Sequence, residues 1–254
     1  MSVRIECRDW VMSIVFDRPD KKNAITAAMY QSIADALGAA AGSRDVRAVL
    51  LRGNAECFTA GNDLEDFLKN PPHAEDTPVF RFLQALTTFE KPLLAAPCGV
   101  AVGVGVTMLL HCDLVYAGDN ARLSLPFVQL GLCPEAASSL LLPALAGHQR
   151  ATEKLLLGEP FGADEARELR LVNRVLPAAE AIGFAHAQAA RIAALPPQAV
   201  RTTKRLLRQA WRDPIAQQMN AENAAFRQLL TSPEAREAFT AFLEKRKPDF
   251  SRFA

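Results

Sequence analysis

The stretch EKPLLAAPCGVAVGVGVTMLLHCDLVYAG, residues 90–118, constrains the fold more than any other segment of the chain. Residues 93–98 form a short apolar run bounded by a proline and a glycine, which is typical of a fully buried strand. Gly99, Gly103 and Gly105 follow, and the apolar run then continues without a break. We therefore expect a strand, a glycine-rich turn and the first turn of a buried helix, in that order.

A glycine turn that leads into a helix is suited to binding negative charge. Glycine lets backbone N–H groups approach a ligand closely, because no side chain stands in the way. The first N–H groups of a helix are unpaired and carry partial positive charge. The stretch therefore predicts a site that holds an oxyanion, although glycines that only allow tight packing of strand against helix remain an alternative.

Two other interpretations of this stretch are disfavoured. Residues 93–110 carry no charge and approach the length of a membrane span, but Pro97, the glycines and nearby Asp113 argue against one. The G-x-G pattern at residues 103–105 has Met108 in place of the third glycine, and no acidic residue lies about 20 positions further on. We therefore expect neither a membrane helix nor a dinucleotide fingerprint.

Composition indicates an ordinary globular protein. The chain has 254 residues, half of them hydrophobic, and a net charge of +1, which gives no reason to expect nucleic acid or an anionic membrane as partner. Its five cysteines are scattered without a C-x-x-C pair, and four of its first ten residues, Arg4, Glu6, Arg8 and Asp9, are charged. We expect reduced cysteines, no secretory signal and a cytoplasmic location.

The hydrophobic pattern predicts strands mixed with helices up to about residue 177 and only helices beyond it. The expected strands cover residues 3–7, 11–16, 46–51, 93–98, 114–117, 121–125 and 171–176. The expected helices cover residues 27–42, 79–89, 151–157, 163–170, 178–194, 197–210, 214–230 and 233–246. Residues 53–58 and 70–78 are expected to be loops, the second of them exposed.

Two features of the residues point to chemistry. Gly61 and the pair Gly103/Gly105 each follow an apolar run, and amides that converge from two such turns can hold one carbonyl oxygen as it becomes negative. Glu135 lies in the run LCPEAASSLLLPAL, where burial raises a carboxyl pKa and makes a better proton acceptor. A glutamate that follows a proline at a helix start is the structural alternative.

Other polar residues are weaker candidates. The four histidines have no metal-ligand spacing with each other or with cysteine, so no metal site is expected. Asp113 is expected to accept hydrogen bonds from nearby backbone donors. Five cations fall on one helical face that is expected to be solvated. They are Arg201, Lys204, Arg205, Arg208 and Arg212.

Several segments together resemble the crotonase, or enoyl-CoA hydratase/isomerase, superfamily. They are RPDKKNAIT (18–26), CFTAGNDL (57–64), KPLLAAPCGVAVGVG (91–105), CDLVYAGDNARLSLP (112–126), LGLCPE (130–135), ADEARELRLVNRV (163–175) and FLEKRKPDF (242–250). The resemblance implies an α/β fold with a spiral of ββα units over residues 1–195 and a helical oligomerisation region over 196–254. It also implies a homotrimer or a dimer of trimers, and an acyl-CoA thioester as substrate without a cofactor.

The resemblance assigns roles by position. The oxyanion hole is formed by the backbone N–H groups of Asn62 and Val104, and Glu135 is the catalytic base. The residues implied to bind substrate or CoA are Lys21, Asn23, Ala24, Ala60, Gly61, Asp63, Leu64, Gly103, Gly105, Phe127, Leu130 and Lys245. Glu65 stands where some relatives have a lysine near CoA, which weakens the case for a contact between residue 65 and CoA.

The placement of carboxylates favours isomerisation within the family. Hydratases of the family use two glutamates to activate water, and this chain has Thr107 and Phe127 at those positions. A single glutamate at the position of Glu135 resembles the peroxisomal-type Δ3,Δ2-enoyl-CoA isomerases. The alternatives are hydration of an enoyl-CoA, another reaction of the family that needs one acid, and a non-catalytic member that only binds acyl-CoA.

Overall fold

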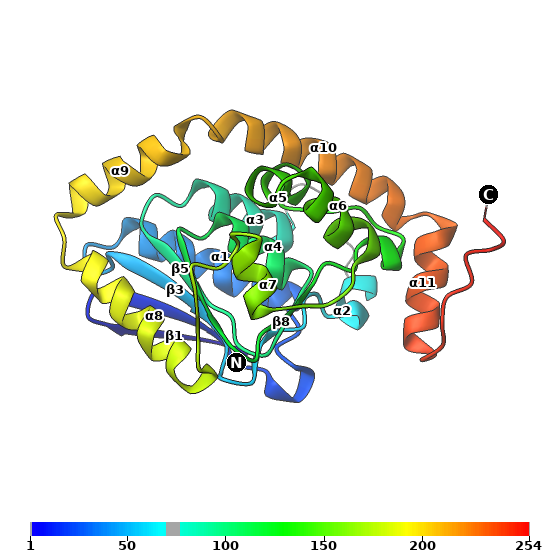
Figure 1. The fold of residues 1–254 in the computed structure, drawn as a ribbon, viewed down its shortest axis with the longest axis horizontal. Helices are drawn as coiled ribbons and strands as arrows, with labels where there is room; N and C mark the ends of the chain where they lie inside the picture. The colour runs from blue at the N-terminus through cyan, green and yellow to red at the C-terminus, as the bar shows by residue number, and fades with distance from the viewer. Residues whose placement is uncertain (1, 70–76, 254) are drawn as a thin grey trace.

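The computed structural model describes residues 2–69 and 77–253, which form two β-sheets surrounded by helices (Figure 1). The larger sheet has the strand order β1-β2-β3-β5-β7-β10, and the smaller has the order β4-β6-β8-β9. The strands are β1 Val3–Arg8, β2 Val11–Phe16, β3 Ala48–Arg52, β4 Cys57–Thr59, β5 Leu93–Ala96, β6 Val100–Val102, β7 Leu114–Gly118, β8 Arg122–Ser124, β9 Phe161–Gly162 and β10 Arg174–Leu176. The α-helices are α1 Ala27–Gly42, α2 Leu64–Lys69, α3 Pro78–Thr88, α4 Val104–Thr107, α5 Ser138–Ala146, α6 His148–Leu157, α7 Ala163–Glu168, α8 Ala178–Ala193, α9 Pro197–Gln209, α10 Arg212–Leu230 and α11 Pro233–Leu243.

From β3 to β8, consecutive strands belong to alternate sheets, and this alternation produces a spiral. Strands β3, β5 and β7 lie in the larger sheet, whereas β4, β6 and β8, which directly follow them, lie in the smaller one. Pairing is parallel between β3, β5 and β7 and again between β4, β6 and β8. The predicted α/β spiral of ββα units is therefore confirmed.

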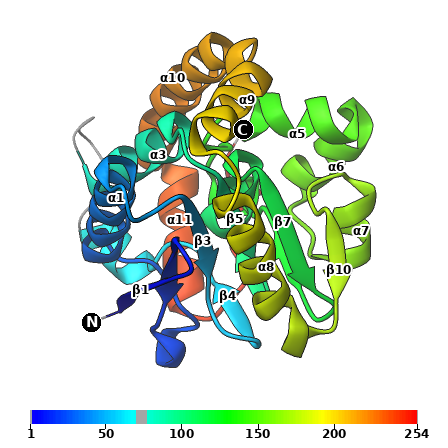
Figure 2. The ribbon, with the colours of Figure 1, turned by 90° about the vertical axis from the view of Figure 1, so that its left-hand side faces the viewer.

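Both faces of the larger sheet are covered at its central strands, which explains why β2 and β5 are almost continuously apolar, whereas the edge strand β1 is exposed. Every residue of β2 and β5 is buried. On one face lies α8, whose small residues at four-residue spacing let the helix approach the strands closely (Figure 2). These residues are Ala181, Ala185, Ala189 and Ala193. The other face contacts the main core, to which α1, α3, α10 and α11 also contribute.

The structure corrects the prediction for the glycine-rich segment. The expected strand at residues 93–98 is β5, but the chain does not pass from it directly into a glycine turn and a helix. Instead Gly99 turns the chain into β6, and Gly103 then leads into α4. Strands β4 and β9 were likewise not expected, and β4 replaces part of the loop predicted at residues 53–58. These strands have two or three residues, too few to show a period, and their pairing comes from tertiary structure.

The helices of the last third are confirmed, and they pack onto the core rather than standing apart. In Figure 1, α9 and α10 arch over the molecule and α11 descends beside it. The division into a core over 1–195 and an oligomerisation region over 196–254 stays a prediction. None of the described helices is long and apolar enough to cross a bilayer. Residues 70–76 of the loop predicted at 70–78 lie outside the described residues.

The prediction that the basic face of α9 is fully solvated is wrong at Lys204 and at Arg208. Arg208 is half-buried, and its guanidinium lies against His111. Lys204 is only 7% exposed, because its ammonium group pairs with Asp113 at 2.7 Å and donates to the Lys91 carbonyl at 2.6 Å. Asp113 also accepts the Leu93 N–H at 2.7 Å, as the sequence predicted. Arg201, by contrast, is exposed. An ion pair between Lys204 of α9 and Asp113, the residue before β7, therefore takes the place of solvent at this position.

The turn at Gly99 provides a test of the fold. A Cβ atom there would lie 1.6 Å from the Glu56 carbonyl oxygen, and φ is +60°. We expect Gly99→Ala to lower the free energy of unfolding by about 3 kcal/mol or more, since both strain and overlap with backbone oppose it. Gly38→Ala is the matched control, because its site in α1 is open, and it should raise stability by about 0.5–1 kcal/mol. Urea unfolding followed by circular dichroism checks both, and equal midpoints for Gly99→Ala and wild type would contradict the assigned turn.

Candidate active site

Two backbone turns lie side by side at one edge of the smaller sheet. Strand β4 leads to Gly61 and Asn62, and β6 leads to Gly103 and Val104. Because β4 and β6 are parallel neighbours, both turns leave the sheet at the same edge. The N–H groups of Asn62 and Val104 make no backbone hydrogen bond among the described residues, and Val104 is the first residue of α4. Both groups are therefore available to a ligand.

The closeness of the two turns explains the glycines. Gly61 has φ of +84°, and a Cβ atom on it would lie 2.7 Å from the Val102 carbonyl oxygen. A Cβ atom on Gly105 would lie 2.7 Å from the Thr59 side chain. Any larger residue would push the turns apart, so the spacing of the two amides depends on these positions.

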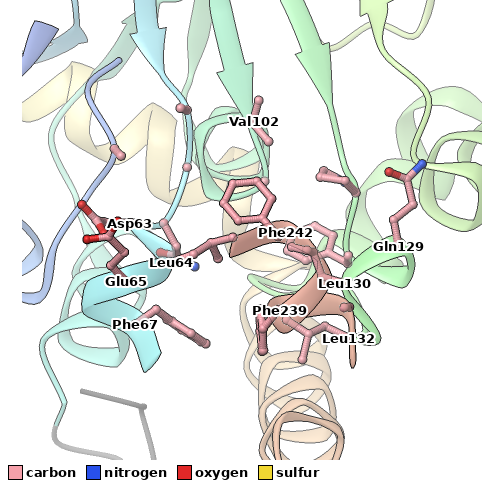
Figure 3. Close-up of a pocket in the computed structure, with 18 of the residues that line it drawn as sticks. Asp63, Leu64, Glu65, Phe67, Val102, Gln129, Leu130, Leu132, Phe239 and Phe242 are labelled. Carbon is pink, nitrogen blue, oxygen red and sulfur yellow. The ribbon is translucent and has the colours of Figure 1, made fainter. Parts of the chain in front are cut away.

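A cavity of about 840 Å³ opens in front of the two turns (Figure 3). The lining combines charged and apolar residues, and Figure 3 shows Asp63 and Glu65 together, on the side away from Leu130 and Leu132. The charged residues are Asp20, Lys21, Lys22, Asp63, Glu65 and Arg246. Figure 3 shows Phe239 and Phe242 of α11 between Phe67 on one side and Leu130 and Leu132 on the other. The rings of Phe67 and Phe239 have centroids 6.3 Å apart. This arrangement suits a ligand with a charged end and an apolar end.

Glu135 is a buried carboxyl group whose surroundings differ strongly from water. Its side chain is 5% exposed, and its Oε1 atom has no hydrogen-bond partner among the described residues. Burial, followed by the negative charge of Glu222, raises the pKa of Glu135 to about 7, and the Thr107 side chain opposes this rise. The hydroxyl groups of Thr107 and Ser138 are buried and also unpaired. A carboxyl group with this pKa accepts and returns protons readily near neutral pH.

Tyr30 connects Glu135 with the first turn. The Tyr30 hydroxyl, from α1, donates a short hydrogen bond to the side-chain oxygen of Asn62. Burial raises the pKa of Tyr30 well above its usual value, and the charge of Glu135 raises it further. The phenol therefore stays neutral and keeps its proton for the bond to Asn62. Glu135 and the turn at Asn62 thus share one buried neighbour.

The structure brings together most residues that the sequence singled out. The cavity is lined by Lys21, Ala24, Ala60, Gly61, Asn62, Asp63, Leu64, Gly103, Val104, Phe127 and Leu130. Asn23, Gly105, Glu135 and Lys245 are not part of its lining. Asn23 and Gly105 support the turns from behind, since the Asn23 amide donates to the carbonyls of Cys57 and Phe58 at 3.1 Å. Lys245 is exposed, and its neighbour Arg246 lines the cavity while paired with Glu237.

Several site residues were not found from the sequence. Tyr30 carries a usable signal, because it lies three residues before Ile33 on the buried face of α1 and a buried phenol needs a partner. Glu222, Phe226, Phe239 and Phe242 belong to helices distant in sequence, where periodicity predicts a buried face but not its contacts. No group of three or more His, Cys, Asp or Glu side chains that could hold a metal ion occurs within residues 2–69 and 77–253.

Comparison with known proteins gives one consistent result. A family model described as enoyl-CoA hydratase/isomerase matches residues 6–252. The 2,3-dehydroadipyl-CoA hydratase of Escherichia coli (strain K12) is 33% identical over 94% of this chain and 94% of its own length. The enoyl-CoA delta isomerase 2 of Homo sapiens is 36% identical over 86% of this chain and 57% of its own length. A crystal structure of an enoyl-CoA hydratase/isomerase from Pseudoalteromonas atlantica T6c superposes with a TM-score of 0.94 at 40% identity, covering 98% of this chain and 100% of that one.

The burial of Glu135 predicts how stability depends on pH. Its pKa is about 7 in the folded protein, against 4.5 as the ordinary value. Between these values the unfolded chain has released the proton and the folded chain retains it, so stability falls as pH rises through this window. We expect Glu135→Gln to be more stable than wild type by about 3 kcal/mol above pH 7, and the difference to vanish below about pH 4.5. Urea unfolding at several pH values measures it, with Glu180→Gln, an exposed site on α8, as a control that stays within about 0.5 kcal/mol. Equal stability of Glu135→Gln and wild type at every pH would mean that the carboxyl is solvated.

Proposed function

The chain belongs to the enoyl-CoA hydratase/isomerase family, and on that premise we propose that it is a Δ3,Δ2-enoyl-CoA isomerase. In this reaction Glu135 removes a proton from C2 of a 3-enoyl-CoA, and the electrons move to the thioester oxygen as a dienolate. The N–H groups of Asn62 and Val104 hold that oxygen. Glu135 then returns the proton to C4, which leaves the double bond between C2 and C3. The same carboxyl group thus acts first as base and then as acid.

The observation that carries the proposal is the lone carboxyl with its raised pKa. One group that accepts and returns the same proton works best with a pKa near the working pH, and Glu135 has a pKa of about 7. A general base contributes about 10²–10⁴-fold to rate. Each oxyanion donor contributes about 3–4 kcal/mol of barrier lowering. Both effects strengthen in the dry surroundings of the buried turn.

Three other carboxyl groups, those of Asp20, Asp63 and Glu65, line the cavity, but Glu135 lacks the second glutamate with which hydratases of the family activate water. The positions that carry glutamates in hydratases hold Thr107 and Phe127, neither of which ionises at neutral pH. Glu222 is the nearest other carboxyl that acts on Glu135, but its two oxygens accept the N–H groups of Ala137 and Ser139. A carboxylate engaged in this way supports the chain and is not free to hold a water molecule. This arrangement favours proton transfer over hydration.

Hydration of a 2-enoyl-CoA is the second candidate function. It is favoured by the similarity to a hydratase from Escherichia coli over almost the whole chain. The two functions differ in what they do to absorbance, because isomerisation creates a conjugated enoyl thioester and hydration removes one. A panel of 3-enoyl- and 2-enoyl-CoA esters of several chain lengths therefore separates them. Binding of the esters without turnover of either would indicate a non-catalytic acyl-CoA-binding protein.

Glu135→Gln tests the proposed role directly. Glutamine has nearly the same shape but cannot accept a proton, so we expect kcat for a 3-enoyl-CoA to fall by about 10³-fold or more. Affinity for a saturated acyl-CoA, measured by calorimetry, should change less than about threefold, because the cavity is unaltered. The control Glu180→Gln should retain wild-type kcat. A kcat of Glu135→Gln within tenfold of wild type would exclude Glu135 as the base.

We further propose that the protein works as a homotrimer or a dimer of trimers in the cytoplasm. Large apolar side chains are exposed along α9 and just after it, as expected of a surface that another copy covers. They are Leu206, Leu207 and Trp211. All five cysteines are free thiols, which suits a reducing compartment.

The exposed face of α9 provides a test of assembly. Leu207 is 75% exposed, so Leu207→Glu leaves the fold of one chain unchanged. Light scattering should give a mass of three or six chains for wild type and a lower mass for Leu207→Glu, since a charge would be buried between copies. Gln209→Glu on the same helix, outside the three apolar positions, is the control. A wild-type mass of a single chain of 27.6 kDa would contradict the proposed assembly.

A further inference from the structure

Glu135 is followed by a strained backbone. Ala136 and Ala137 both have positive φ, of 59° and 55°, and both are fully buried. A non-glycine residue in this left-handed region costs about 1–2 kcal/mol, and two in succession occur only where the surroundings hold them. The turn connects the candidate base to the first residue of α5. The direction of the Glu135 side chain therefore depends on whatever fixes this turn.

His111 holds the turn from one side. Its Nε2 atom lies 2.7 Å from the Ala136 carbonyl oxygen. Burial lowers the pKa of His111 to about 4, so the ring is neutral at neutral pH. Arg208 approaches Nδ1 at 3.5 Å and has only hydrogens to offer, so Nε2 carries the ring hydrogen and donates it to Ala136.

Glu222 holds the turn from the other side. It lies on α10, in line with Met219 and Phe226, on the face that packs against the core. Its Oε2 atom accepts the Ala137 N–H at 2.6 Å, and its Oε1 atom accepts the Ser139 N–H at 2.9 Å. Oε1 also accepts a short hydrogen bond from the Ser139 hydroxyl. A carboxyl that is 5% exposed and bonded in this way is tied to one geometry.

We propose that Glu222 and His111 are positioning residues that hold the Ala136–Ala137 turn and so direct the Glu135 carboxyl toward the oxyanion turn. The inference rests on the proposed function, because it assigns Glu222 and His111 to the reaction that Glu135 performs. The pair comes from two different elements, α10 and the 3₁₀-turn Met108–His111 that follows α4. Loss of either contact frees one end of the strained turn, which then relaxes away from positive φ.

Glu222 also sets the charge that Glu135 experiences. The other titratable groups near Glu135 are neutral at pH 7, since burial raises the pKa of Tyr30 well above its usual value and that of Cys133 to about 11. His111 is neutral, and the cations Lys204 and Arg208 lie beyond it. Burial also raises the pKa of Glu222, hydrogen bonds from Ser139 and Ala137 oppose that rise, and its charge when ionised disfavours ionisation of Glu135. Removing that charge should lower the pKa of Glu135, and the effect on kcat of a change in Glu222 geometry then shows whether Glu222 also positions the turn.

Two substitutions separate the geometric and the electrostatic effects. Glu222→Gln removes the charge and retains one acceptor, so the acid limb of the kcat/KM profile should move to lower pH. Glu222→Asp retains the charge but shortens the side chain by one methylene group, so its carboxyl lies further from the turn. The acid limb of the kcat/KM profile should then stay in place, while kcat falls about tenfold to a hundredfold. Affinity for a saturated acyl-CoA should change less than about threefold in both. Asp213→Asn removes an exposed charge from the first turn of the same helix and should leave profile and kcat unchanged.

A titration of Glu135 itself makes the result independent of turnover. In protein labelled with ¹³C at glutamate side-chain carboxyls, the Glu135 resonance is identified by its absence in Glu135→Gln. Its midpoint should move to lower pH in Glu222→Gln and not in Asp213→Asn. If wild type isomerises no 3-enoyl-CoA, the proposed function fails, whereas this titration still decides whether Glu222 acts on Glu135.

Two results would contradict the positioning role of Glu222. An unchanged midpoint in Glu222→Gln together with wild-type kcat in Glu222→Asp would show that Glu222 only caps α5. If Glu222→Gln does not fold, the kcat values of Glu222→Asp and Ser139→Ala test the proposal instead. Ser139→Ala removes the hydrogen bond from the Ser139 hydroxyl to Glu222 and leaves the carboxyl groups of Glu135 and Glu222 in place. We therefore expect kcat to fall a few-fold. Wild-type kcat in both of these variants would overturn the proposal.

Discussion

The desolvation of one carboxyl group, Glu135, is the constraint on which the rest of the site depends. A carboxylate that is removed from water and placed near another negative charge opposes folding, and its raised pKa is the measure of that opposition. The fold tolerates it because the turn that carries Glu135 is held on both sides, by His111 and by Glu222. Residues with strongly shifted pKa values concentrate at functional sites for this reason. Stability is lower at this position than an uncharged side chain would allow, which is the expected cost of the proton-transfer role that we propose for Glu135.

The spiral architecture supplies the other half of the site without any functional side chain. Each pair of strands contributes one member to the smaller sheet, so the turns after β4 and β6 leave that sheet at the same edge. Glycine at position 61 lets the first turn contact the Val102 carbonyl, and the helix that begins at Val104 leaves its first amides unpaired. Two amides therefore converge through backbone geometry alone. Their spacing is fixed by sheet pairing, which is the most rigid element available.

Whether a feature could be predicted from the sequence depends on how far apart along the chain the interacting residues lie. Glu135 stands out because it is an isolated charge in an apolar run, which is visible within a dozen residues. The longer strands and helices were predictable for the same reason. Glu222 is 85 residues from Ala137, and its own neighbours on α10 are mostly polar, so nothing local distinguishes a buried glutamate from a solvated one. Lys204 was misplaced on the solvated face because its partner Asp113 belongs to a distant segment.

The C-terminal helices contribute side chains to the candidate site itself, which a region used only for oligomerisation would not need to do. Helix α10 provides Glu222 to the turn of the base and Phe226 to the cavity, and α11 provides Phe239 and Phe242. Helix α9 places Arg208 against His111, on the other side of the same turn. A shift of these helices relative to the sheets would therefore change the direction of Glu135 and the shape of the apolar end together. If a neighbouring copy packs on the exposed face of α9, as we propose, assembly fixes the helices that hold the catalytic turn, and catalysis then depends on assembly through His111 and Glu222.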